Sequence, residues 1–330
     1  MSGISENRLE ATQQNSFIRF IKYVWAEYSI IPVFILIFVV CAIIAPRFAT
    51  ANNIMAIFRN ASIVGVIALG MTFVIITGGI DLSCGHALAA SGTVLIIMQG
   101  NAAIPIPVAI LACVAMATAI GFINGAIITK LKLPAFIVTL AIGALARSIT
   151  MYVGGGATIV GRNIPEFTRI GNGSIGIVPI PLIVFSVSAI ILGCILAYTR
   201  YGSSTYAVGD NESAARYSGI KTDRIKIYAY MLTGFCVGIA ATLDMSRMAA
   251  VSAATSGTNY EFDAITAVII GGTSLAGGRG RIVGTFIGMF IIGIVSNLMV
   301  MMSISPFLSG AVKGGVILIA VLFQKREKAV

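Results

Sequence analysis

Long apolar runs separated by short polar segments constrain this chain more than any other feature. Uncharged runs of about 16–20 residues recur along the 330 residues, which is more than a soluble core needs and close to the length of a helix that crosses a bilayer. Hydrophobic residues make up 58% of the chain and charged residues only 10%. The sequence therefore predicts an all-α, polytopic membrane protein.

The apolar runs and their breakers predict about ten transmembrane helices. They centre near residues 29–45, 62–77, 83–99, 105–128, 134–153, 179–198, 227–245, 262–276, 282–300 and 306–323. The runs beside Gly78 and Gly277 are short, so broken or partly inserted helices are expected there. Glycines at Gly121/Gly125 and Gly234/Gly238 have the spacing that lets membrane helices approach closely, within one chain or between two copies.

The basic residues are expected to set the orientation of the chain. The net charge is +10, but the basic residues lie in short segments between apolar runs, which excludes nucleic-acid binding as their purpose. With ten spans and a cytoplasmic N-terminus, most of the 22 Lys and Arg residues face the cytoplasm, so both termini are predicted there. The expected division is a cytoplasmic segment at 1–28, a single transmembrane domain at 29–323 and a cytoplasmic tail at 324–330.

A polar island interrupts the apolar pattern at residues 206–226, "YAVGDNESAARYSGIKTDRIK". Asp210 or Asn211 can cap a helix, Glu212 would lie in its first turn, and Gly219 would end it. This pattern predicts a helix of about seven residues, about 10 Å long. Composition leaves two interpretations open, a self-capped helix on the membrane surface or a helix that docks into a groove of a soluble partner.

Charged residues inside apolar runs need partners or a wet cavity. Arg147 and Lys313 are such charges, and their candidate partners are Asp244, Glu261 and Asp263. The segment 154–179 would form either a contact for another protein or an ordinary connecting loop.

Asp81 follows the Gly78-Gly79 pair, where a carboxylate would either take part in gating or cap the next span together with Ser83. A weak internal similarity relates residues 74–92 to 268–288, since both contain an apolar run, a double glycine and a short polar break. No metal site is suggested.

A nucleotide-binding loop is missing from the sequence. The nearest approach, "SGIKT" at 218–222, lacks the glycine that must precede the lysine, and the chain contains no Gly-Lys dipeptide. If ATP drives this protein, another subunit must bind it.

Four stretches carry a family resemblance. They are "MTFVIITGGIDLSCGHALAASG" (71–92), "AVGDNESAARYSGI" (207–220), "YEFDAITAVIIGGTSLAGGRGRIVGT" (260–285) and "VKGGVILIAVL" (312–322). Over about residues 45–325 the chain resembles the permease subunits of bacterial ABC importers for monosaccharides, of the ribose-importer type.

The resemblance implies a multi-pass permease of the bacterial inner membrane that translocates a pentose or hexose and is not itself an enzyme. Its implied partners are a cytoplasmic ATPase that binds ATP, a periplasmic sugar-binding protein and a second permease copy, a homodimer being favoured over a heterodimer. The loop at 199–226 would couple to the ATPase. The residues expected to form this coupling site are Gly209, Asn211, Glu212, Ala214, Ala215 and Gly219.

A second set of residues is expected to serve translocation or gating. These are Gly78, Gly79, Asp81, Ser83, Asn124, Asp263, Gly271 and Gly272. Asn124 would hydrogen-bond a sugar hydroxyl or simply another helix. Cys84 and Asp244 depart from the family pattern. The alternative function is an ion-coupled secondary transporter, in which Asp81 or Asp244 carries a proton or sodium and no ATPase binds.

Overall fold

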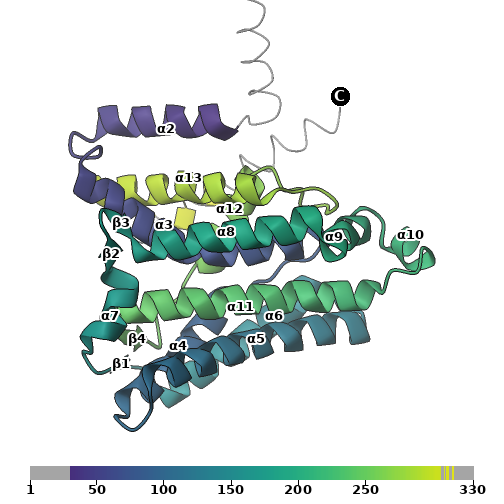
Figure 1. The fold of residues 1–330 in the computed structure, drawn as a ribbon, viewed down its shortest axis with the longest axis horizontal. Helices are drawn as coiled ribbons and strands as arrows, with labels where there is room; N and C mark the ends of the chain where they lie inside the picture. The colour runs from purple at the N-terminus through teal and green to yellow at the C-terminus, as the bar shows by residue number, and fades with distance from the viewer. Residues whose placement is uncertain (1–29, 306–307, 309, 312–313, 316–330) are drawn as a thin grey trace, which may run out of the picture.

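The computed structural model describes residues 30–305, 308, 310–311 and 314–315, and helices dominate this part of the chain (Figure 1). The predicted segments 1–28 and 324–330, and Lys313, lie outside the described residues. The helices are α2 (Ile30–Ile44), α3 (Ala51–Ile76), α4 (Cys84–Gly100), α5 (Ile106–Leu131), α6 (Ala135–Val153), α7 (Pro165–Asn172), α8 (Ile180–Tyr198), α9 (Arg200–Asp210), α10 (Glu212–Tyr217), α11 (Thr222–Met248), α12 (Tyr260–Ile270) and α13 (Ile282–Met301).

Four short strands lie with α7 at one end of the bundle, opposite α10 (Figure 1). The antiparallel pairs are β1 (Thr158–Val160) with β4 (Ala250–Ser252), and β2 (Ser174–Ile175) with β3 (Val178–Pro179). The segment 154–179 therefore contains a helix and three strands, and β1 ties it to the residues that follow α11.

The prediction of about ten spans was wrong. Within residues 30–305, six helices are long and apolar enough to cross a membrane, namely α3, α5, α6, α8, α11 and α13. The other apolar runs counted as spans give α2, α4 and α12, with 15, 17 and 11 residues. At a rise of 1.5 Å per residue, the described residues of these helices reach only about 22, 26 and 16 Å, less than a hydrocarbon core of about 30 Å.

The tenth run, at 306–323, falls mostly outside the described residues. What stands is a helical membrane protein with several spans. The miscount has a physical cause, because an uncharged run marks a helix that avoids water without showing that the helix is long enough to cross a bilayer. The run at 83–99 matches α4 closely, but α4 has only 17 residues, and the run at 262–276 continues past the end of α12 into uncharged residues.

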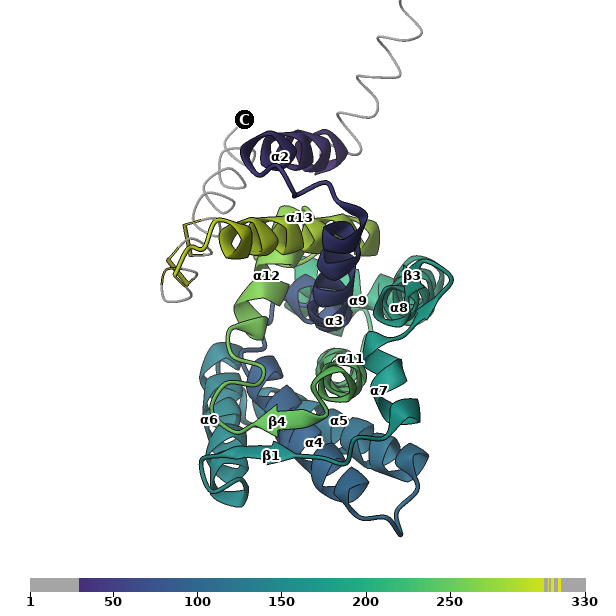
Figure 2. The same ribbon diagram turned by 90° about the vertical axis from the view of Figure 1, so that its left-hand side faces the viewer.

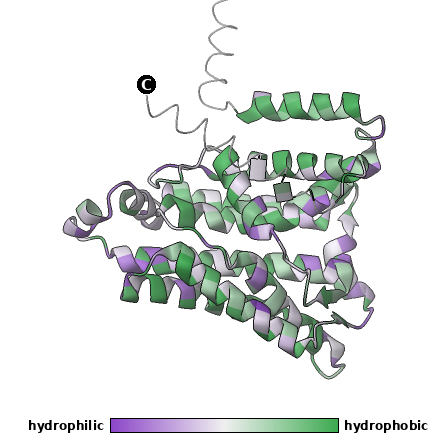
Figure 3. Ribbon diagram, turned by 180° about the vertical axis from the view of Figure 1, so that it is seen from behind, coloured by the Kyte–Doolittle hydropathy of each residue, from purple (hydrophilic) through white to green (hydrophobic). Residues whose placement is uncertain are grey.

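Helix α3 forms the centre of the bundle. It packs against α8, α11, α12 and α13 (Figure 2), and every residue from Ala61 to Ile76 is buried. The outer helices instead expose apolar side chains such as Leu111, Leu140 and Ile190, as expected for surfaces that face lipid. Figure 3 shows hydrophobic residues along the bundle and hydrophilic residues on the α10 loop.

Small residues bring α5 and α11 together within one chain. A Cβ atom on Gly238 of α11 would lie 2.6 Å from the Cα of Val114, and one on Gly125 of α5 would lie 2.8 Å from the Cα of Ile227. Since larger side chains would separate the two backbones, the predicted glycine spacing serves packing inside the subunit.

Candidate functional site at the polar end of the bundle

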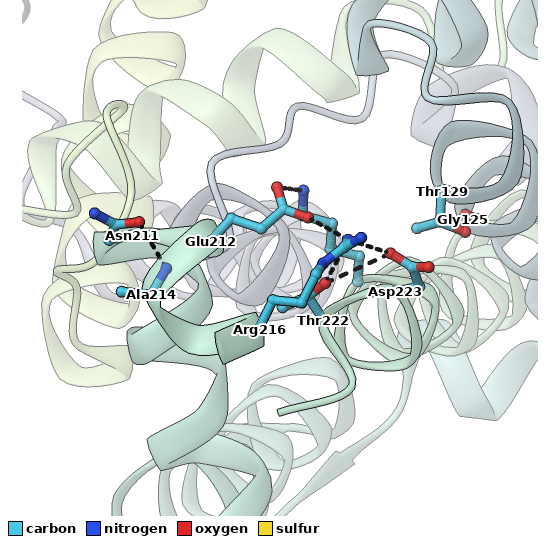
Figure 4. A network of polar contacts seen from close by, with 9 residues as sticks. Gly125, Thr129, Asn211, Glu212, Ala214, Arg216, Thr222 and Asp223 are labelled. Atoms are coloured by element: carbon cyan, nitrogen blue, oxygen red, sulfur yellow. Dashed lines mark hydrogen bonds and ion pairs between the residues drawn. The ribbon is translucent and has the colours of Figure 1, made fainter. Parts of the chain in front are cut away.

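The short helix predicted in the polar island is confirmed as α10. The side-chain oxygen of Asn211 accepts a hydrogen bond from the Ala214 N–H at 3.0 Å, so Asn211 and not Asp210 is the cap (Figure 4). The helix has six residues and ends before Gly219, whose φ of +85° a glycine adopts without strain.

Ion pairs tie α10 to the first turns of α11. The Nζ of Lys226 lies 2.5 Å from Oε2 of Glu212, and the Arg216 guanidinium contacts Glu212 at 3.3 Å and Asp223 at 3.0 Å (Figure 4). Arg216 also donates to the Thr222 hydroxyl at 2.8 Å. Sequence reasoning singled out Glu212 but missed Lys226 and Arg216, although the four-residue spacing of Glu212 and Arg216 is a readable signal.

The pKa of Glu212 reflects this network. Partial burial acts to raise its pKa, but the hydrogen bond and charge of Lys226 and the charge of Arg216 outweigh burial and hold the pKa below its ordinary value. Glu212 is therefore ionised at neutral pH and fixes α10 to α11.

The outer face of α10 is free of the bundle. Tyr217 is 92% exposed and Ala214 is exposed, whereas Ala215 is buried against the protein. A cavity of about 480 Å³ lies between α10, the end of α5 and the start of α11, with Thr129, Lys132 and Tyr217 among its lining residues. The short helix α10, held by its ion pairs, therefore lies at the surface beside a polar cavity.

Two non-helical segments, called here the first and second breaks, come together next to α9. The first break comprises residues 77–83 between α3 and α4, and the second break comprises residues 271–281 between α12 and α13. The Gly278 N–H donates to the Ile76 carbonyl at 2.9 Å, which joins the second break to the end of α3, where the first break begins. The two segments that resemble each other in sequence are thus brought side by side.

Helix α9 touches the second break and the last residue of α3, after which the first break begins. A Cβ on Gly209 would collide with the Ile76 carbonyl oxygen and lie 2.6 Å from the Gly278 nitrogen, so only glycine allows this approach. The Tyr206 hydroxyl donates to the Gly280 carbonyl at 2.7 Å. Gly209 was expected at the coupling site, whereas Tyr206 was missed because nothing in its neighbourhood marks it.

The first break brings Asp81, Ser83 and Asn124 together. The Asp81 carboxylate, 2% exposed, accepts hydrogen bonds from the Ser83 N–H at 2.9 Å and the Ser83 hydroxyl at 2.6 Å. The Asn124 amide donates to the same hydroxyl at 2.8 Å. These bonds fix Asp81 to Ser83 just before α4, but Ser83 makes no side-chain cap to that helix, so capping and gating both stay predictions.

The backbone of the first break is satisfied by side chains from other helices. The Tyr230 hydroxyl donates to the Ile80 carbonyl at 3.3 Å, and the Leu82 N–H donates to the Thr139 hydroxyl at 3.1 Å. Irregular backbone at membrane depth needs such partners because lipid offers none. Tyr230 and Thr139 were missed, since each lies in a long run whose residues look like ordinary packing positions.

The remaining predicted translocation residues lie on α12 or directly after it. Gly271 and Gly272 follow α12 in the second break, Gly272 with a φ of +85°. Asp263 lies in the first turn of α12, 7% exposed, near the opposite end of that helix. The structure therefore divides the predicted set among the two breaks, α5 and the first turn of α12.

Arg147 makes its hydrogen bonds with backbone carbonyls and a hydroxyl, and it also interacts with the charge of Glu261, one of its predicted partners. Its guanidinium donates to the carbonyls of Ser256, at 3.0 Å, and Ala254, and to the Thr258 hydroxyl at 2.8 Å. Asp244, a proposed partner, instead pairs with Arg247 at 3.1 Å.

Comparison with known proteins decides the family. Residues 53–321 match the model of the family described as "Branched-chain amino acid transport system / permease component". The chain belongs to this permease family. No solved structure matches this permease.

Curated relatives of the permease cover nearly all of it. The permease is 38% identical over 322 residues to the ribose import permease protein RbsC of Escherichia coli (strain K12), covering 96% of this chain and 99% of that protein. It is 43% identical over 297 residues to RbsC of Bacillus subtilis (strain 168), covering 90% and 91%. It is 34% identical over 308 residues to the L-arabinose transport system permease protein AraH of Escherichia coli (strain K12), covering 93% of each.

These matches confirm the resemblance predicted from the motifs. The permease is a transport component and not an enzyme. Its relatives and its six apolar helices make it a multi-pass protein of the bacterial inner membrane.

Proposed function

We propose that this permease is the membrane-spanning subunit of an ATP-driven importer for a monosaccharide, pentose or hexose. The names of its relatives, a ribose import permease and an L-arabinose transport system permease, support the substrate class. The chain lacks a nucleotide-binding loop, so ATP is bound and hydrolysed by a separate cytoplasmic ATPase.

The distribution of basic residues supports a cytoplasmic position for the α10 end. Those at or near the α10 end are Lys130, Lys132, Arg200, Arg216, Lys221, Arg224, Lys226, Arg279 and Arg281. Those towards the β1–β4 end are Arg47, Arg59, Arg147, Arg162, Arg169 and Arg247. An excess of Lys and Arg marks the cytoplasmic side, and this comparison does not depend on how many spans the chain has.

The contact of α9 with the end of α3 and with the second break carries the proposed mechanism. The ATPase would hold α10 by its exposed face, and the ion pairs of Glu212 would make α10 and the start of α11 move as one body. Through Gly209 and Tyr206, a displacement of α9 reaches the end of α3, where the first break begins, and the second break at once. Both breaks adjoin transmembrane helices, so ATP-dependent closure of the ATPase would shift α3 and α13 together.

The pathway itself is proposed to lie between two permease copies. The centre of the described bundle is filled by α3, whose inner half is completely buried, so one subunit offers no channel through its core. Two identical copies would enclose the path, and a periplasmic sugar-binding protein would deliver sugar at the β1–β4 end.

Co-purification tests this function. A tagged permease is extracted from membranes containing the complete importer, as wild type, Ala214→Arg and Glu166→Arg. Ala214 is exposed on α10, and Glu166 is exposed on α7 at the other end. An ATPase should accompany the wild type and Glu166→Arg and be lost from Ala214→Arg. A wild type that supports sugar uptake without any ATPase would overturn the proposal.

A further inference from the structure

A polar cavity lies at the β1–β4 end, away from the coupling loop. It has a volume of about 310 Å³ and is enclosed by α3, α12, α13 and the last turn of α11. The first three of these helices pack side by side (Figure 2). Its polar lining residues are Asn60, Arg247, Tyr260, Asp263, Ser296 and Asn297.

The polar groups of the cavity are held in place by one another. Arg247 donates to the Asn60 side-chain oxygen at 2.5 Å and pairs with the buried Asp244 at 3.1 Å. The Tyr260 hydroxyl donates to the other oxygen of Asp244 at 3.3 Å. Asp244 thus orients two of the cavity's side chains.

The α13 wall is fixed in the same way. Asn53 and Asn297 exchange two amide hydrogen bonds, each 2.9 Å long, across α3 and α13. Ile57, Val64 and Met289 supply apolar surface beside these polar groups. A cavity with fixed donors, fixed acceptors and an apolar wall is preorganised to bind a small polar molecule.

We propose that this cavity binds the monosaccharide at the outer entrance of the transport path. The inference rests on the proposed function and adds a sugar site to it. A sugar ring presents hydroxyls that both donate and accept, together with apolar C–H faces, and the cavity supplies partners for each. Its volume is at the lower end of small-molecule sites, which start at about 300 Å³.

Charge and hydrogen bonding favour a neutral, hydroxyl-rich ligand. The lining contains one arginine and one aspartate, Arg247 and Asp263, so neither sign is in excess for an ion. The Nε of Arg247 is buried and makes no hydrogen bond among the described residues. A buried donor without a partner is costly, and a sugar hydroxyl would relieve that cost where an apolar solute would not.

Uptake by the complete importer in proteoliposomes tests the site, with D-ribose and L-arabinose as probes. Ser296→Phe fills the cavity, whereas Val295→Phe places the same side chain on the adjacent residue of α13, which does not line it. Ser296→Phe should slow ATP-dependent uptake at least tenfold, with ATPase co-purification retained and Val295→Phe within twofold of wild type. Equal rates for wild type and Ser296→Phe would overturn the site.

Cysteine labelling gives a readout that does not require transport. Ser296→Cys, in a Cys194→Ser background that removes the exposed native thiol, is labelled with an impermeant maleimide. A site on a transport path must bind its ligand weakly enough to release it, so a high sugar concentration of about 100 mM is used. At that concentration, bound sugar should shield the thiol and slow labelling at least threefold. Unchanged labelling overturns the sugar site, even if Ser296→Phe fails to assemble. Absence of ATP-dependent uptake by the wild type instead contradicts the proposed function.

Discussion

At the scale of single residues, Gly209 is the glycine at which adding one methyl group should lower the stability of the protein most. A methyl group there would press on the Ile76 carbonyl and the Gly278 nitrogen, so Gly209→Ala should destabilise the protein by about 1–3 kcal/mol through overpacking. Gly193→Ala on α8 is the control, because its nearest neighbour would be 3.8 Å away and alanine favours the helix by about 0.5–1 kcal/mol. The measurement is the midpoint of thermal unfolding in detergent. A Gly209→Ala midpoint at or above that of Gly193→Ala would contradict the close contact.

The ionisation of Glu212 predicts a pH dependence of the coupling loop. Because its pKa is lowered in the folded protein, its ion pairs stabilise the loop above the ordinary carboxyl range and are lost as the pH falls through the lowered pKa. Amide hydrogen exchange in residues 212–226, corrected for its intrinsic pH dependence, should therefore be slow at pH 7 and rise on acidification. Glu212→Gln should exchange faster at pH 7 and lack the acid step. Identical exchange of the two proteins at pH 7 would show that the ion pairs do not hold the loop.

At the scale of elements, the first break depends on side chains from distant helices. Tyr230 is 1% exposed and donates to the part-buried Ile80 carbonyl, which the Thr139 hydroxyl also contacts at 3.5 Å. Tyr230→Phe removes the shorter of these two hydrogen bonds and should cost about 0.5–1.5 kcal/mol. Tyr228→Phe, on the exposed side of the same helix, should change stability by less than about 0.5 kcal/mol. Thermal unfolding of the two variants measures the difference. Equal midpoints would mean that another group satisfies Ile80.

The elements that the sequence predicted are those with local causes. The α10 helix follows from its cap, its acidic first turn and the terminating Gly219, all within nine residues of one another. The breaks follow from double glycines. The number of spans could not be predicted in this way, because an uncharged run also marks helices too short to cross a membrane, such as α4 with 17 residues and α12 with 11. That error turned six long apolar helices into ten spans.

The candidate site was predicted only where its residues are neighbours in sequence. Glu212, Asp81 and Ser83 were singled out because their partners or breakers lie close by. The partners of Arg147 lie up to 111 residues away, and the Asn53–Asn297 pair spans 244 residues, so no spacing rule joins them. Packing of distant helices creates these contacts, and a single sequence contains no direct record of it.

At the scale of the whole molecule, the function requires the two ends of the bundle to face opposite sides of the membrane. Tyr217 on α10 is 92% exposed and Ile177, between β2 and β3, is 80% exposed, so each tolerates substitution and remains open to reagents. With Cys194→Ser as background, Ile177→Cys should react with an impermeant maleimide added outside spheroplasts. Tyr217→Cys should react only after permeabilisation, because the excess of Lys and Arg holds its end in the cytoplasm.

The labelling experiment tests the orientation of the permease in the membrane without depending on which proteins bind it. Reaction of Tyr217→Cys in intact spheroplasts would place α10 outside, where no ATPase could reach it, and would remove the basis for coupling through α9. The expected pattern would leave α10 beside the cytoplasm and the cavity around Arg247 towards the periplasm. A sugar delivered from the periplasm would then reach that cavity before the two breaks, and energy applied at α10 would act on the breaks from the opposite side. This order is what alternating access requires of one subunit.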